Sequence, residues 1–103
     1  MDKEQAITLV KKYSDVIKEI FSVKKIVLYG SYSRGEQKEW SDIDVAVFLN
    51  EKEKDILDSE FKLYKLRRNI DLRIEPIILD EENDESGFVS EVLNSGIIIY
   101  QSN

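Results

Sequence analysis

Two aspartates, Asp42 and Asp44, are the residues of this sequence whose types and spacing most directly suggest chemistry. They stand two positions apart at the start of an apolar run that continues to Phe48. Side chains alternate between the faces of a β-strand, so both carboxylates would share one face while Ile43 and Val45 point the other way. Like charges this close repel unless a cation lies between them. Oxygen ligands without His or Cys nearby favour Mg²⁺, which takes one or two protein carboxylates and completes its shell with water and substrate phosphates. The pair therefore predicts a magnesium site and a phosphate-bearing substrate.

A short turn ahead of these acids can hold such phosphates. Residues 26–29 are apolar and read as a strand, and Gly30-Ser31 breaks it where the backbone needs freedom to approach a ligand closely. Backbone N–H groups of the turn, the Ser31 hydroxyl and the Arg34 guanidinium can all donate hydrogen bonds to phosphate oxygens. The common GxGxxG and GxxxxGK[ST] phosphate motifs do not occur in the chain.

The spacing of the two features is distinctive. Gly30-Ser31 is followed by ten residues and then by Asp42-Ile43-Asp44. This pattern resembles the signature of the polymerase-β-like nucleotidyltransferase superfamily, and the chain is similar to its minimal nucleotidyltransferase (MNT) domains. The resemblance implies one α+β domain over residues 1–103, with a small mixed or antiparallel sheet of about four strands packed against helices.

The resemblance also implies a reaction. Asp42 and Asp44 would hold Mg²⁺, and a nucleoside monophosphate, expected to be AMP from ATP, would pass to a hydroxyl acceptor. Ser31, the backbone around Gly30 and Arg34 would hold the β- and γ-phosphates. Members of the superfamily use a third carboxylate on a neighbouring strand, which shares the metal and takes the proton of the acceptor.

Two residues are candidates for this third carboxylate. A strand is expected over residues 69–79, in which Asp71, Arg73 and Glu75 alternate with apolar side chains and share the polar face. Asp71 has the more usual residue type in its context, whereas Glu75 lies closer to the expected spacing before the final helix. Glu75 is slightly preferred, and Arg73 would contact phosphate or pair with an acid. Pro76 indicates an edge strand or a bend.

Composition excludes several other functions. The chain has 103 residues without Cys or His, so it offers no disulfide, thiol nucleophile, Ser-His-Asp site or usual zinc site. Its net charge of −6 disfavours binding to long nucleic acid but is compatible with a single magnesium-bound nucleotide. No apolar run of membrane-spanning length and no signal peptide is found, so we expect no membrane association and a cytoplasmic location.

A chain of this length leaves no room for a separate acceptor-binding domain. The acceptor is therefore expected on a partner chain or in a homodimer. MNT domains pair with small helical HEPN-type proteins as toxin–antitoxin couples, so the resemblance implies an antitoxin that adenylylates its partner. Two alternatives stay open: a non-catalytic antitoxin or scaffold that acts by contact, and a nucleotide sensor that binds Mg-ATP without transfer.

Periodicity predicts the remaining elements. Besides the strand over 69–79, we expect helices over residues 2 or 3 to 20, 55–68 and 88–95, and strands over residues 25–29, 43–49 and 97–100. The first two strands are joined by a turn and should be antiparallel or locally mixed. The last strand should be buried.

Apolar side chains at helical spacing predict which faces of two helices are buried. The first helix should bury Ala6, Val10, Tyr13, Ile17 and either Ile20 or Phe21. The helix over residues 55–68 should bury Ile56 or Leu57, Phe61, Tyr64, and Leu63 or Leu66.

Overall fold

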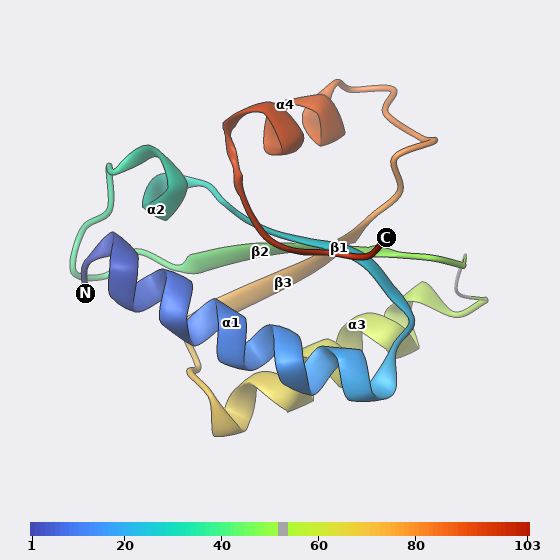
Figure 1. Ribbon diagram of the computed structural model, residues 1–103, viewed down its shortest axis with the longest axis horizontal. Coiled ribbons are helices and arrows are strands. Elements are labelled where there is room, and N and C mark those ends of the chain that lie inside the picture. Colours follow the sequence, from blue (N-terminus) through green and yellow to red (C-terminus); the bar gives the residue numbers. More distant parts are fainter. Residues whose placement is uncertain (52–53) are drawn as a thin grey trace.

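A four-stranded mixed sheet in the order β3-β2-β1-β4 lies at the centre of the molecule (Figure 1). The computed structural model describes residues 1–51 and 54–103. Its elements are, in chain order, α1 (Lys3–Ile20), β1 (Val23–Tyr29), α2 (Ser31–Arg34), β2 (Ile43–Leu49), α3 (Ile56–Leu66), a 3₁₀ turn (Arg67–Asn69), β3 (Ile74–Leu79), α4 (Phe88–Ser95) and β4 (Ile97–Gln101). β1 pairs antiparallel with β2 and β4, while β2 pairs parallel with β3. The predicted α+β fold with a mixed sheet is confirmed.

Helix α1 begins and packs as its sequence predicts. The Asp2 side chain accepts a hydrogen bond from the Gln5 backbone at 2.8 Å, and the Gln5 side chain accepts one from the Asp2 backbone at 2.9 Å. This capping box satisfies backbone donors that the first turn leaves without partners. At the other end Phe21 is buried and Ile20 is exposed, which settles that alternative. The buried face comprises Ala6, Val10, Tyr13, Ser14 and Ile17.

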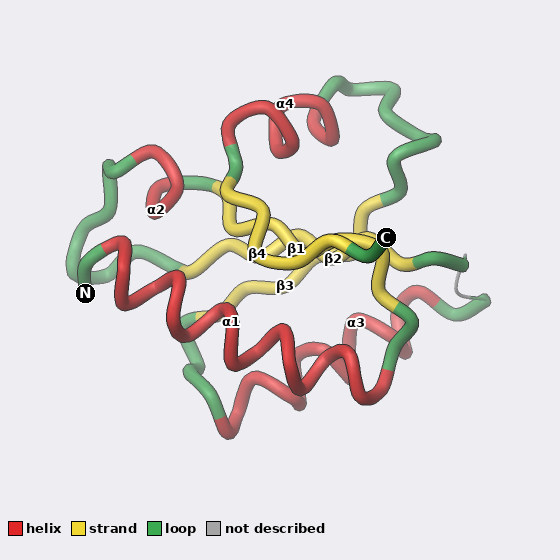
Figure 2. Tube along the Cα trace, in the orientation of Figure 1, coloured by secondary structure: helices red, strands yellow, loops and turns green. Residues whose placement is uncertain are grey.

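Two layers of apolar side chains fill the faces of the sheet. Helices α1 and α3 cover one face, drawn below the strands in Figure 1, and α4 covers the other; Figure 2 shows the same division. Ile43, Val45 and Val47 belong to the cluster on the α1 side. Ala46 and Phe48 belong to the cluster that includes Val89 and Val92 of α4. Alternation along β2 therefore places Asp44 on the α4 side of the sheet.

The buried face of α3 differs from the prediction. Ile56, Leu57 and Phe61 are exposed, with Leu57 at 81% and Phe61 at 57%, so their expected burial is wrong. Leu63 is buried, which confirms that alternative, and Ser59 is buried although it was not expected to be. The Tyr13 hydroxyl of α1 donates a hydrogen bond to the Leu63 carbonyl at 2.7 Å. This contact sets which side of α3 faces the core. Of the remaining expected residues, Tyr64 and Leu66 are partly buried.

The predicted strand over residues 69–79 is wrong in its first part, because β3 begins only at Ile74. The Asp71 carboxylate accepts hydrogen bonds from the backbone and side chain of Arg73 at 2.9 Å each, and this local turn replaces strand pairing. Pro76 lies in an edge strand, as expected. The last strand β4 is the opposite edge, and Ile98 is 48% exposed, so the expected burial of this strand is wrong.

No helix in residues 1–51 and 54–103 combines the length and hydrophobicity that a bilayer crossing requires.

Candidate active site

Strand register brings acids and phenols together on the α4 side of the sheet. Asp44 in β2 lies opposite Glu75 in the parallel neighbour β3, and opposite Tyr29 in the antiparallel neighbour β1. Residues paired in this way share one face of a sheet at about 5 Å. Asp42 stands just before β2 and is exposed, and its charge acts on Asp44. The structure therefore gathers Asp42, Asp44 and Glu75 in one region.

The turn after β1 lies directly against these acids. Gly30 has φ 75° and ψ −150°, a conformation that L side chains rarely adopt. A Cβ atom at this position would collide with the Asp44 carboxylate. Glycine is therefore required both for the turn and for the close approach of the backbone to Asp44. Ser31 then begins α2, whose first N–H groups lack partners within the helix.

Arg34 and Ser33 complete the turn. The Ser33 hydroxyl donates a hydrogen bond to the Gly30 carbonyl at 2.9 Å and holds the bend in place. Arg34 is exposed and forms an ion pair with Glu36 at 3.4 Å. Burial raises the pKa of Asp44, and the positive charge of Arg34 partly opposes that rise. Gly30, Ser31 and Arg34 thus lie beside the acids, where an anionic ligand would meet both sets of residues.

Asp44 carries an unfavourable charge in the folded chain. Burial raises its pKa from 3.8 to about 6, and the neighbouring charges of Asp42 and Glu75 contribute to the rise against the opposing effect of Arg34. Burial also raises the pKa of Tyr29 to about 12, with further contributions from Asp44, Tyr64 and Glu75. A bound cation would relieve this concentration of negative charge.

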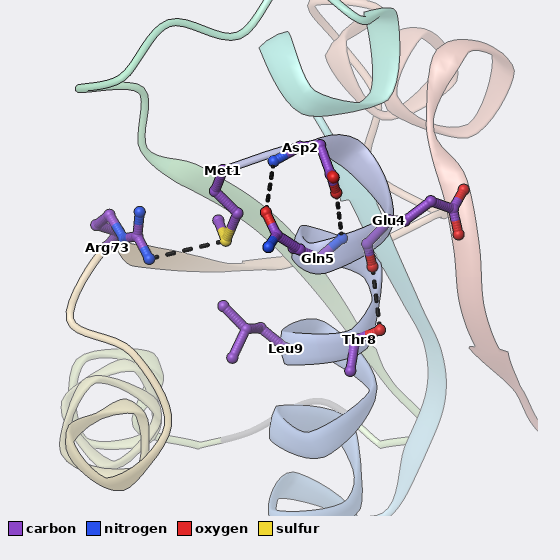
Figure 3. A pocket seen from close by; sticks show the side chains of 7 residues that line it. All are labelled: Met1, Asp2, Glu4, Gln5, Thr8, Leu9 and Arg73. Carbon is purple, nitrogen blue, oxygen red and sulfur yellow. Dashed lines mark hydrogen bonds between the residues drawn. The ribbon is translucent and has the colours of Figure 1, made fainter.

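Asp71, the other candidate for the third carboxylate, lies apart from this group. It sits in the turn before β3, and the Arg73 guanidinium at 2.7 Å holds the pKa of Asp71 below its usual range. Arg73 also approaches the Met1 sulfur at 3.7 Å and lines a pocket of about 720 Å³ at the start of α1 (Figure 3). The structure therefore brings Glu75 to Asp44 and pairs Asp71 with Arg73 instead.

Two further residues contact Glu75. Neither was predicted from the sequence to belong to the site. The Tyr64 hydroxyl donates a hydrogen bond to Glu75 Oε2 at 2.9 Å, and Arg67 lies 3.6 Å from Glu75 Oε1. Arg67 is itself held by the carbonyls of Leu72 and Ile74, each at 2.8 Å. Tyr64 and Arg67 are three residues apart and share a side of the helical segment, which is the signal available in the sequence. The helical apolar stripe assigned Tyr64 to the core instead.

Asp42 and Asp44 can supply two of the ligands of Mg²⁺ but not a complete set. Within the described part of the chain, no three acidic side chains converge closely enough to hold a metal ion by themselves. Mg²⁺ is usually held by one or two carboxylates, with water and substrate phosphates completing the octahedron. Asp42 and Asp44, with the phosphate-sized turn beside them, offer that donor set.

Comparison with known proteins identifies the family. Residues 11–103 match the family model described as polymerase beta, nucleotidyltransferase. The chain belongs to the polymerase-β nucleotidyltransferase family. A Methanocaldococcus jannaschii relative named as a protein adenylyltransferase is 32% identical over 99 residues, which cover 90% of this chain and 97% of the relative. The predicted enzyme class, a nucleotidyltransferase, is confirmed.

Local similarity is higher in the same group of relatives. A second M. jannaschii protein of that name is 51% identical over 39 residues, which are 38% of this chain. A third is 46% identical over 43 residues. These two matches span 45% and 43% of the relatives' own lengths.

Solved structures share the fold across nearly the whole chain. A crystal structure from Sulfolobus solfataricus, assigned as a nucleotidyltransferase, has a TM-score of 0.69 at 21% identity, covering 96% of this chain and 83% of that one. A toxin–antitoxin complex with AMP-PNP has a TM-score of 0.63 at 24% identity, covering 100% and 76%. A tri-AMPylated Shewanella oneidensis HEPN toxin in complex with its MNT antitoxin gives 0.60 at 22% identity, covering 97% and 73%. At these identities the likeness establishes the fold.

Proposed function

We propose that this nucleotidyltransferase uses Mg²⁺ to transfer AMP from ATP to a hydroxyl group on a partner protein. The observation that carries the proposal is the packing of the Gly30 turn against Asp44, which in turn lies opposite Glu75. A triphosphate in that turn would have its α-phosphorus beside the acids. Phosphoryl-group transfer depends mainly on such positioning and on charge stabilisation.

Each residue of the site has a role in this reaction. Asp42 and Asp44 would hold Mg²⁺, which neutralises the triphosphate and stabilises the departing pyrophosphate. The Ser31 hydroxyl, the first N–H groups of α2 and the Arg34 guanidinium would bind the β- and γ-phosphates. Glu75 would accept the proton of the attacking hydroxyl, because it is the carboxylate next to Asp44 on the neighbouring strand.

ATP as the donor is supported by the relatives. Those reported above are named as protein adenylyltransferases, and one structural neighbour was solved with AMP-PNP. The donor base is therefore proposed to be adenine.

A HEPN-type protein is the acceptor that the neighbours favour, with this chain acting as its antitoxin. One neighbour is an MNT antitoxin bound to an AMPylated HEPN toxin. The exposed apolar side chains of Leu57 and Phe61 on α3 offer a surface for such a partner. Phe61 lies one helical turn from Tyr64, so a partner seated there would reach the neighbourhood of Glu75.

Labelling of the partner tests the proposal. The purified chain is incubated with α-labelled ATP, Mg²⁺ and the protein encoded beside it as the candidate acceptor. The partner should gain label, and Asp44→Asn should reduce the rate by about 100-fold or more. Asp15→Asn is the matched control, because Asp15 is an exposed aspartate of α1 that forms an ion pair with Lys18. Absence of partner labelling with every common nucleoside triphosphate would refute the transferase proposal, and neutralisation without labelling would favour an antitoxin that acts by contact.

A further inference from the structure

Tyr64 contacts Glu75, the carboxylate proposed as the base of the reaction. Its hydroxyl donates to Glu75 Oε2 at 2.9 Å, within the range through which a general base receives a proton. The other tyrosine hydroxyls of the described chain lack such a contact: none of them is bonded to a carboxylate, and Tyr13 donates to a backbone carbonyl. Tyr64 is only partly buried.

Arg67 contacts both Glu75 and Tyr64. It is anchored by two backbone carbonyls, lies 3.6 Å from the second oxygen of Glu75, and stacks on the Tyr64 ring at 4.7 Å. A nucleophile within reach of a base that a third group orients is the arrangement found in activated nucleophiles. The hydrogen bond to Glu75 raises the pKa of the Tyr64 phenol, so the group stays protonated at neutral pH and needs a base to react.

The nucleotide site adjoins this pair. Glu75 and Asp44 are paired across β3 and β2, and neighbouring strands lie about 4.8 Å apart. Asp44 is also paired with Tyr29 of β1, so Tyr29, Asp44 and Glu75 form one row across three strands. A phosphorus atom held at Asp44 would therefore have Glu75 and the Tyr64 hydroxyl on its β3 side.

We infer that Tyr64 is a self-modification site, at which the chain adenylylates its own phenol when ATP is bound and no partner is present. This inference rests on the proposed function. The Tyr64 oxygen forms a bond to the α-phosphorus while the bond from that phosphorus to the bridging oxygen breaks. Pyrophosphate leaves with the electron pair, and Glu75 receives the phenolic proton. The product is a tyrosyl-AMP phosphodiester next to Glu75, which blocks the base from a partner hydroxyl.

Incubation of the chain alone with α-labelled ATP and Mg²⁺ tests the inference. The chain should gain the mass of one adenylyl group, and peptide mapping of the wild type should place it on Tyr64. The rate per chain should not depend on protein concentration, because the hydroxyl and the base belong to one molecule. Tyr64→Phe should lower self-labelling by about 10-fold or more, whereas Tyr100→Phe, which removes a tyrosine hydroxyl far along the chain on β4, should not.

The outcomes separate this inference from the proposed function. Label on the partner but none on the chain, or label mapped to another residue of the chain, overturns the inference and leaves the proposed function standing. Label on neither protein overturns the proposed function as well. Because the map is made on the wild type, a folding defect in Tyr64→Phe cannot decide the result.

Discussion

Replacement of Asp44 by asparagine should stabilise the metal-free protein while it abolishes transfer. The folded chain keeps Asp44 protonated up to about pH 6, whereas the unfolded chain releases that proton near pH 3.8. Between these values the folded state binds more protons than the unfolded state, so stability falls as pH rises through this window and stays lower above it. Asparagine carries no charge, so the variant does not lose stability as the pH rises through this window.

The size of the effect follows from the same values. The full difference between the folded and unfolded pKa values of Asp44 corresponds to a loss of about 3 kcal/mol of stability at neutral pH. Asp44 is partly exposed, so solvent screening reduces the expected gain to about 1–2 kcal/mol. For a domain of this size, that gain raises Tm by roughly 5–15 °C.

Urea unfolding followed by circular dichroism, in EDTA and at pH values between 4 and 8, measures this difference. At pH 7.5 the free energy of unfolding of Asp44→Asn should exceed that of the wild type by about 1–2 kcal/mol. The two free energies should converge toward pH 4. Added Mg²⁺ should stabilise the wild type at pH 7.5 and lose its effect below about pH 6, because protons then compete for Asp44. Asp15→Asn should leave the pH dependence unchanged. A variant less stable than the wild type at pH 7.5 without metal would refute the reasoning, since it would show that the carboxylate makes a net favourable contact.

Three other substitutions follow from the geometry. Gly30→Ala should destabilise the fold by about 1–3 kcal/mol more than Gly87→Ala in thermal unfolding. Both positions have positive φ, but of the two only Gly30 lies against the Asp44 carboxylate. Equal losses of stability in the two variants would contradict this explanation. Glu75→Gln should slow partner labelling by about 100-fold while Asp71→Asn stays within about 3-fold, and the reverse order would make Asp71 the third acid. Tyr13→Phe should cost about 1–2 kcal/mol in urea unfolding without changing Mg-ATP affinity by calorimetry, because it loses a buried hydrogen bond on the opposite side of the sheet.

Local patterns predicted the parts of the fold that depend on local physics. Apolar spacing predicted α1, which spans Lys3–Ile20, and alternation predicted β2 at Ile43–Leu49. One failure lies where tertiary packing competes with the pattern, and the other where a local side-chain turn competes with it. The face of α3 is chosen by contact with α1, and the segment before β3 is chosen by the Asp71 turn. Either face of α3 is compatible with helical spacing, and the alternation before β3 does not exclude a turn, so the pattern alone could not choose.

The sequence alone determined the family and the type of chemistry, because Gly30-Ser31 and the Asp42–Asp44 pair lie within one short run whose spacing is fixed along the backbone. Only the tertiary structure decided which distant acid joins them. The parallel register of β2 and β3 places Glu75, and not Asp71, beside Asp44. The packing of α3 then brings Tyr64 and Arg67 to Glu75. Strand register and helix rotation are set by contacts between residues far apart in the chain, and these are the relations that spacing along the sequence does not contain.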